Sequence, residues 1–225
     1  MISAPPVQLE QAAGRPGEPL RMSFEDFLKW EHNGIAEWVN GEVTVMAVKN
    51  EHQRIVDFLI QVMGIFARLL KLGIIRSAPY AMRIAAGGSA REPDLMFVSA
   101  EHQARVTSDF LDGPADLVVE VVSDESVARD YDEKFSEYQN GGVREYWIID
   151  PRPDRQRASF FVRDAQGRFR PVATDDEGIY RSTVLPGFWL KLDWFWLGDA
   201  EPDPVAALAQ LIGPERLAAA LNTQP

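Results

Sequence analysis

The sequence predicts an α/β domain in which a mixed β-sheet carries helices on its faces. Three observations lead to this prediction. Apolar residues recur at three- and four-residue spacing from Ile55 to Leu70, as on one face of a long helix. The run from Asp116 to Val122 is apolar on both alternating faces, which is typical of a strand covered on both sides. A helical pattern from Asp130 to Asn140 then separates that strand from the strand-like run REYWIID.

The first elements are predicted by their end signals. Ser23 followed by Asp26 resembles a capping box, so a short helix through about Trp30 is expected. Asn40-Gly41 lies between two alternating runs and favours the type I′ turn of a β-hairpin. The long helix is expected to begin near Glu51 and to use Gly73 as its C-cap.

The remaining elements follow from alternation and turn residues. Strands are expected at Tyr80–Ile84 and Leu95–Val98, separated by a Gly87-Gly88 turn. After Pro151, the runs ASFFVRD and RFRPVA predict a hairpin, and GFWLKLDWFW predicts a further strand. We divide the chain into a tail (1–20), one domain (21–200) and a C-terminal helical extension (201–225).

Composition limits the function classes. The 225 residues contain no cysteine, which excludes disulfides and thiolate chemistry and fits a reducing compartment, so a cytoplasmic location is expected. The start of the chain does not read as a signal peptide. The apolar stretch from Ile55 to Leu70 is interrupted by Asp57, Gln61 and Arg68, so no membrane segment is expected. The net charge of −11 argues against a broad nucleic-acid-binding face. Six arginines between positions 152 and 170 could form a local basic patch or a solvated hairpin.

Two carboxylates have the arrangement of a metal site. Asp94 opens one predicted strand, and Glu120 lies within the apolar run LVVEVV of another. A buried carboxylate costs several kcal/mol unless a cation or strong donors compensate it, and Mg²⁺ is held by one or two carboxylates with water. The alternative is a Glu120 that faces solvent at a sheet edge or pairs with an arginine such as Arg83.

A lysine on the following helix could complete such a site. Lys134 and Tyr138 are one turn apart and share a helix face. From there the amine could orient an attacking water and offset charge on a phosphate. The alternative is an ordinary solvated pair with Asp130, four residues earlier.

The chain resembles the Uma-type restriction endonuclease family, a group within the PD-(D/E)XK nuclease superfamily. The resemblance extends from about Ser23 to Leu192. It rests on EWVNGEVTVM with His52 shortly after, YAMRI, EPDLMFV, DLVVEVVSDES and, most specifically, RDYDEKFSEYQNGGVREYWIIDP. It implies a restriction-endonuclease-like mixed β-sheet core flanked by helices, here with an added C-terminal β-hairpin.

The resemblance also implies roles for individual residues. Asp94 and Glu120 match the two acids that bind Mg²⁺, for which Mn²⁺ can substitute. Glu37 and the main-chain carbonyl of Val121 are further implied ligands. The superfamily's usual lysine would stand two residues after the second acid, where this chain has Val122. Lys134 is its natural replacement, and this relocation is the step in the mechanism that depends most on the structure.

Aromatic and imidazole groups are secondary candidates. His52 could carry a proton or contact substrate, or simply make a local hydrogen bond near a helix start. Tyr138 and Tyr146 could stack on bases, although their spacing is more typical of core residues, and Trp147 is interpreted as core outright.

The expected function is metal-dependent endonucleolytic hydrolysis of DNA. DNA is therefore the expected partner, no membrane is involved, and a homodimer is compatible with the sequence. The alternatives are a nuclease-fold binding or regulatory protein with weak or no turnover, favoured by the acidic charge and by Val122, and an enzyme acting on small phosphate esters.

Overall fold

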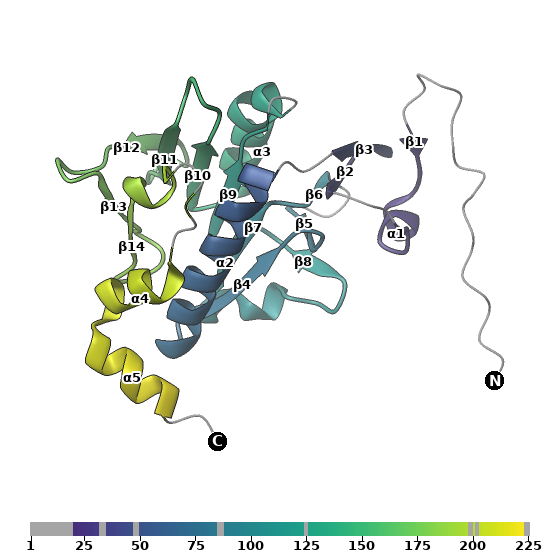
Figure 1. The fold of residues 1–225 in the computed structure, drawn as a ribbon. Helices are drawn as coiled ribbons and strands as arrows, with labels where there is room; N and C mark the ends of the chain where they lie inside the picture. The colour runs from purple at the N-terminus through teal and green to yellow at the C-terminus, as the bar shows by residue number, and fades with distance from the viewer. Residues whose placement is uncertain are drawn as a thin grey trace.

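The computed structural model describes residues 20–31, 35–46, 50–84, 88–123, 126–197, 200 and 203–222. Nearly all of the predicted tail and Gly87 of the predicted turn lie outside these residues. The described part contains two six-stranded sheets, a two-stranded sheet and helices packed on their faces (Figure 1). The predicted mixed α/β fold is therefore confirmed.

One sheet, which we call the central sheet, has the strand order β12-β11-β10-β9-β7-β4. These strands span, in that order, Phe169–Val172, Arg157–Arg163, Glu145–Asp150, Leu117–Val121, Leu95–Ser99 and Gly73–Ser77. The β9 and β10 strands are parallel, whereas the other neighbours are antiparallel. Parallel neighbours require a crossover connection, and the helix predicted from Asp130 supplies it. Both β9 and β10 are buried along their whole length, as expected for strands covered on both faces.

The first face of the central sheet is covered by α2 (Asn50–Leu69) and α4 (Pro204–Ile212), which pack against each other. Odd-numbered strand residues such as Leu117, Val119 and Trp147 join these helices in one apolar cluster. Leu208 of α4 belongs to the same cluster. The C-terminal region therefore contributes directly to the packing beside α2, as Figure 1 shows.

The opposite face is covered by α3 (Lys134–Gly141), which follows a single π-helical turn, η2 (Arg129–Glu133). Even-numbered strand residues such as Val118 and Ile148 pack here against Tyr138 of α3. Gly142 ends the helix in the left-handed conformation (φ 95°), and its amide donates to the carbonyl of Tyr138. The predicted helix and its glycine terminator are confirmed, and the helix reaches its end one turn beyond Tyr138.

The second sheet has the order β1-β3-β2-β6-β5-β8 and lies to one side of the central sheet (Figure 1). Its strands span, in that order, Leu20–Arg21, Glu42–Met46, Ile35–Val39, Ala90–Arg91, Ala81–Arg83 and Phe110–Asp112. The predicted hairpin is β2–β3, and Asn40 (φ 51°) and Gly41 (φ 89°) both have the positive φ of a type I′ turn.

The first helix, α1, is shorter than predicted and spans only Phe24–Phe27. Its predicted cap is present, because the Ser23 hydroxyl oxygen accepts a hydrogen bond of 3.1 Å from the Asp26 amide. The buried side chains of Phe24 and Phe27 pack over the second sheet. The capping box predicts where the helix begins, but the prediction that it continues to about Trp30 is wrong.

The prediction that Gly73 caps α2 is wrong. The left-handed residue is Lys71 (φ 54°), and the amides of Lys71 and Leu72 donate to the carbonyls of Arg68 and Ala67. This is the hydrogen-bond pattern of a Schellman motif, here without glycine at its usual position. Gly73 instead begins β4, a strand that the sequence analysis did not predict.

Gly73 is required by the close approach of β7. A Cβ atom at this position would lie 2.2 Å from the carbonyl oxygen of Val98 and 2.8 Å from the Cα of Ser99. Because both are backbone atoms, Gly73→Ala is expected to lower the free energy of unfolding by about 1–3 kcal/mol, measured by urea denaturation. The matched control is Gly64→Ala in α2. A Cβ atom at Gly64 would have no atom within 4 Å beyond its own helix backbone and chain neighbours, so alanine is expected to stabilise the protein by about 0.5–1 kcal/mol. Equal effects at both positions would contradict this account.

The C-terminal part adds the short hairpin β13 (Ile179–Arg181) and β14 (Trp189–Lys191), followed by α4 and α5 (Pro214–Asn222). The strand predicted over residues 187–196 is therefore too long, because a 3₁₀ turn begins at Leu192. No helix among the described residues combines the length and apolar composition needed to cross a membrane.

Candidate active site

The central sheet brings Asp94 and Glu120 together. Antiparallel β7 and β9 pair Leu95 with Val119, so one further step along the same register places Asp94 opposite Glu120. Directly opposed residues project from the same face of a sheet, here the face covered by α3. One oxygen of Asp94, Oδ2, also accepts a hydrogen bond of 2.7 Å from the Val121 amide. The two acids therefore converge.

Glu120 is buried and accepts hydrogen bonds from two residues of α3. Its Oε2 accepts a hydrogen bond from the Lys134 amine at 2.9 Å, and its Oε1 accepts one from the Tyr138 hydroxyl at 2.7 Å. Only 2% of Glu120 is exposed, so it does not face solvent. Arg83 instead donates to Asp112 at 3.0 Å. Neither alternative for Glu120 is correct, and Lys134 does reach the end of the β9 strand.

The Lys134 amine is shared by three carboxylates. It lies 2.7 Å from Glu37 Oε1, 2.9 Å from Glu120 Oε2 and 3.1 Å from Asp130 Oδ1. The pair with Asp130 thus exists, but both side chains are buried, so its interpretation as a solvated surface pair is wrong. Asp130 is held in turn by Ser126, whose hydroxyl donates to Oδ2 at 2.5 Å.

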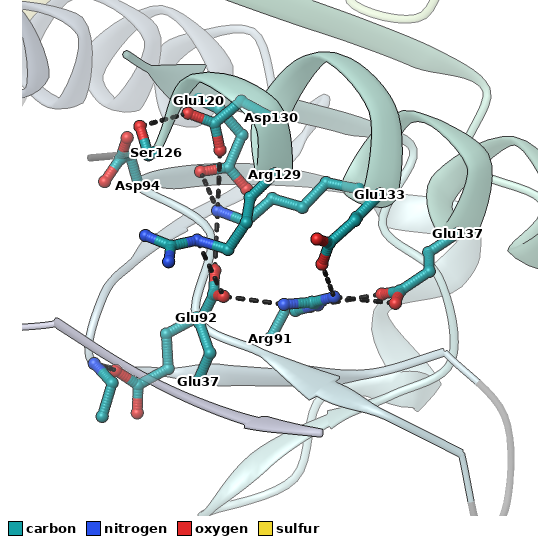
Figure 2. A network of polar contacts seen from close by, with 12 residues as sticks. Glu37, Arg91, Glu92, Asp94, Glu120, Ser126, Arg129, Asp130, Glu133 and Glu137 are labelled. Atoms are coloured by element: carbon teal, nitrogen blue, oxygen red, sulfur yellow. Dashed lines mark hydrogen bonds and ion pairs between the residues drawn. The ribbon is translucent and has the colours of Figure 1, made fainter. Parts of the chain in front are cut away.

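Glu37 links this cluster to an arginine that the sequence analysis missed. Arg91 is 2% exposed and donates to Glu37 Oε2 at 2.7 Å, while its other nitrogens form a bidentate pair with Glu137 at 2.7 and 2.8 Å. Figure 2 shows these groups meeting beneath the helix. Burial raises the pKa of Glu37, but attraction by Lys134 and Arg91 outweighs it, so the pKa lies below its ordinary value.

The cluster has more buried acids than cations. Burial raises the pKa of Glu120 to about 8; Lys134 opposes this rise, and the neighbouring charges of Asp94, Asp130 and Glu37 add to it. The pKa of Asp130 is also raised, mainly by burial. A carboxylate that is destabilised by neighbouring carboxylates is stabilised by any further cation placed among them. The site therefore has the charge that favours cation binding.

The residues fit Mg²⁺ in charge and donor chemistry. Hard oxygen donors suit this ion, which is commonly held by one or two carboxylates while water completes its shell. Asp94 and Glu120 can supply that pair. Among the described residues no group of three Asp, Glu or His side chains is arranged to hold a metal ion. The Lys134 ammonium lies within ion-pair distance of Glu37, Glu120 and Asp130.

His52 supports Asp94. This residue lies in the first turn of α2, and its Nε2 is 3.0 Å from Asp94 Oδ2. Both side chains are buried. Asp94 is thus fixed from two directions, by the imidazole of His52 and by the Val121 amide. The hydrogen bond of His52 is therefore not the local one considered for a helix start, because its partner is a candidate metal ligand 42 residues further along the chain.

The aromatic candidates are core residues. Tyr138, Tyr146 and Trp147 are all 0% exposed, so no ring face is open for a base to stack on. Their polar groups serve the cluster and the fold instead. The Tyr138 hydroxyl positions Glu120, and the Tyr146 hydroxyl donates to the main-chain oxygen of Asp130 at 2.9 Å. The interpretation of Trp147 as core is confirmed.

A buried acid next to Arg91 was also missed. Glu92 accepts a hydrogen bond of 2.9 Å from the Ala36 amide, and burial raises its pKa to about 7, with a smaller contribution from Glu37. Arg91 and Glu92 immediately precede Pro93-Asp94. Two charged residues adjoining a candidate metal ligand are the signal that could have drawn attention to them.

The fold and the buried cluster of acids and lysine together define a restriction-endonuclease-like α/β protein. The chain belongs to the Uma2 family, described as "Putative restriction endonuclease", whose sequence profile matches residues 24–193. The match begins and ends within one residue of the region identified from motifs. Family membership supports a nuclease role.

A solved structure with the same fold is the crystal structure of a "putative nuclease belonging to DUF820" from Anabaena variabilis ATCC 29413. The two proteins are 15% identical, with a TM-score of 0.60 over 78% of this chain and 97% of the other. At this identity the likeness shows the fold alone. No curated protein matches the chain.

Proposed function

We propose that this protein is a Mg²⁺-dependent endonuclease that hydrolyses phosphodiester bonds in DNA. The observation that carries the proposal is the meeting of Asp94, Glu120 and Lys134 on one face of the central sheet, with the amine 2.9 Å from the Glu120 carboxylate. Two acids beside one lysine supply both a cation-binding pair and a positive hydrogen-bond donor. Membership of the Uma2 family supports this assignment.

In this proposal Asp94 and Glu120 hold the metal, and the Val121 carbonyl and Glu37 are further ligands. A bound Mg²⁺ would polarise a phosphoryl oxygen and lower the pKa of a bound water. His52 and Tyr138 keep the two acids in place through their hydrogen bonds. Glu37 is already paired with Lys134 and Arg91, so its ligand role requires exchange of one of these partners.

Lys134 acts on the substrate side of the proposed mechanism. An ammonium group has three donors, and in this structure three carboxylates surround it. Exchange of one carboxylate for a water or a phosphate oxygen lets the amine orient the attacking water and offset developing negative charge. The remaining two carboxylates keep it in position.

A binding or regulatory role without turnover is the second candidate. It is favoured by the complete pairing of Lys134 within its own cluster and by the net charge of −11. A cytoplasmic location belongs to the main proposal. A homodimer belongs to it as well, since two paired nuclease sites could address both strands of a duplex.

The test is a cleavage assay on supercoiled, linear and single-stranded DNA with Mg²⁺ or Mn²⁺. The wild-type protein is expected to cut at least one of these substrates, and Asp94→Asn is expected to lose at least about 100-fold of that activity, since it removes a ligand. EDTA should abolish cutting. Equal cutting by wild type and Asp94→Asn would point to a contaminating nuclease and refute the proposal.

A further inference from the structure

The arginine-rich stretch separates into two groups in space. Residues 152–170 contain six arginines against two aspartates, a net charge of +4 in a chain of net charge −11. Arg157 is the first residue of β11 and Arg155 lies two residues before it, whereas Arg168 and Arg170 follow the far end of β11. Because β11 has seven residues, the two groups are about 20 Å apart along the strand.

The first group lies at the same sheet edge as the candidate active site. Parallel strands end at the same edge, and Glu120 is paired with Ile148 near the ends of β9 and β10. Two residues further along β10, Asp150 is paired with Arg157. Arg157 is thus two strands across the sheet from Glu120 and two residues further along, so their main-chain positions are about 12 Å apart.

Arg157 also lies on the same face as Glu120. Paired residues share a face, and the pairs Glu120–Ile148 and Asp150–Arg157 are joined by two residues of β10, which restores the same side. The guanidinium of Arg157 lies over the Tyr131 ring, 5.3 Å from its centroid, on the π-helical turn before Lys134. The Arg157 guanidinium is therefore held on the α3 face of the central sheet, where Asp94 and Glu120 converge.

Arg155 and Arg157 are exposed, unlike the cations of the buried cluster. Of the neighbouring charged residues, Arg152 forms a bidentate pair with Asp150 at 2.7 and 2.8 Å. Asp154 is exposed. Arg157 and, two residues before it, Arg155 are exposed arginines at the sheet edge that carries the acids. Exposed guanidinium groups make charge-assisted hydrogen bonds to phosphate.

We propose that Arg155 and Arg157 form a DNA-backbone-binding surface, the arginine rim, that holds phosphates flanking the scissile bond. This inference rests on the proposed function, since it names the partner of the same site. It gives a chain of net charge −11 two exposed guanidinium groups with which to engage a polyanion. Backbone contacts position DNA without reading its sequence, so the rim acts on all sequences alike.

The test measures DNA affinity against salt concentration. Each protein carries Asp94→Asn so that a labelled duplex is not cut, and binding is followed by fluorescence anisotropy. Arg155→Ala/Arg157→Ala is expected to weaken binding of unrelated sequences equally and to reduce the slope of log K against log salt by about 2. In the cleaving protein the same double variant should raise KM and leave kcat unchanged.

Two controls accompany the double variant. Arg168→Ala/Arg170→Ala removes the same charge at the far end of the hairpin and is expected to leave the slope unchanged. Arg155→Lys/Arg157→Lys keeps the charge and is expected to retain the slope. An unchanged slope in the alanine rim variant, or an equal decrease in the far-end control, overturns the inference while cleavage by wild type leaves the proposed function standing. Absence of both cleavage and salt-dependent binding in wild type refutes both.

Discussion

Lys134→Ala is expected to lower the free energy of unfolding by about 3–5 kcal/mol, the usual loss when one partner of a buried ion pair is removed. Three buried carboxylates share this amine, and the variant leaves them to repel one another. The loss should be smaller near pH 5 than near pH 8, because Glu120 and Asp130 have raised pKa values and are protonated more readily in acid. Urea denaturation at both pH values measures the difference.

The control for this prediction is Lys191→Ala. Lys191 pairs with Asp193 at 3.4 Å, and the two side chains are 38% and 75% exposed, so its removal is expected to change stability by less than about 1 kcal/mol. A loss in Lys134→Ala no larger than in Lys191→Ala would show that the cluster contributes nothing to the fold.

DNA cleavage by folded Lys134→Ala is expected to fall at least about 100-fold, since a transition-state donor is lost.

Glu120→Gln is expected to abolish cleavage and yet to stabilise the metal-free protein at high pH. The pKa of Glu120 is about 8 in the folded protein against an ordinary value of 4.5. An acid whose pKa is raised by folding binds its proton more tightly in the folded state, so wild-type stability falls as the pH rises from about 4.5 through about 8. Glutamine cannot ionise, so the stability of the variant does not fall in this way as the pH rises. Denaturation in EDTA should therefore show similar stabilities near pH 4.5 and a more stable variant near pH 8.5.

Glu145→Gln is the matched control, with the opposite expected sign. Glu145 is also fully buried, but it accepts hydrogen bonds from the Trp147 indole, the Thr183 amide and hydroxyl, and the Val184 amide. Glutamine replaces one of the two acceptor oxygens by an NH₂ donor, which leaves the donors that face it unsatisfied at a cost of about 1–3 kcal/mol. Destabilisation by both substitutions at pH 8.5 would contradict the charge account of the Glu120 site.

The fold was predictable where local chemistry decides local structure. Asn40-Gly41 marks a hairpin because both residues tolerate positive φ, and the apolar face of α2 is long enough to be unambiguous. The short strands β4 and β6 were missed because their pairing is decided by distant partners. Gly73 illustrates this point: as a residue it indicates a helix end, but the carbonyl of Val98 explains why glycine is needed there.

The candidate site was predictable in its three principal residues and not in their surroundings. Asp94, Glu120 and Lys134 stand in recognisable motifs, and the structure brings them together. The roles of Arg91 and Glu37 depend on a contact between residues 54 positions apart, which no local pattern shows. Asp130 was misjudged because its four-residue spacing to Lys134 is also that of a surface pair, and only the tertiary packing shows that both are buried.

The most direct test of the central claim is a calorimetric titration of Mg²⁺ into wild type, Asp94→Asn and Glu120→Gln. If the two acids hold one cation beside Lys134, wild type binds Mg²⁺ saturably, both acid variants lose that binding, and folded Lys134→Ala retains it because the competing ammonium is gone. Saturable Mg²⁺ binding of unchanged affinity in both acid variants would contradict the account and place the metal elsewhere.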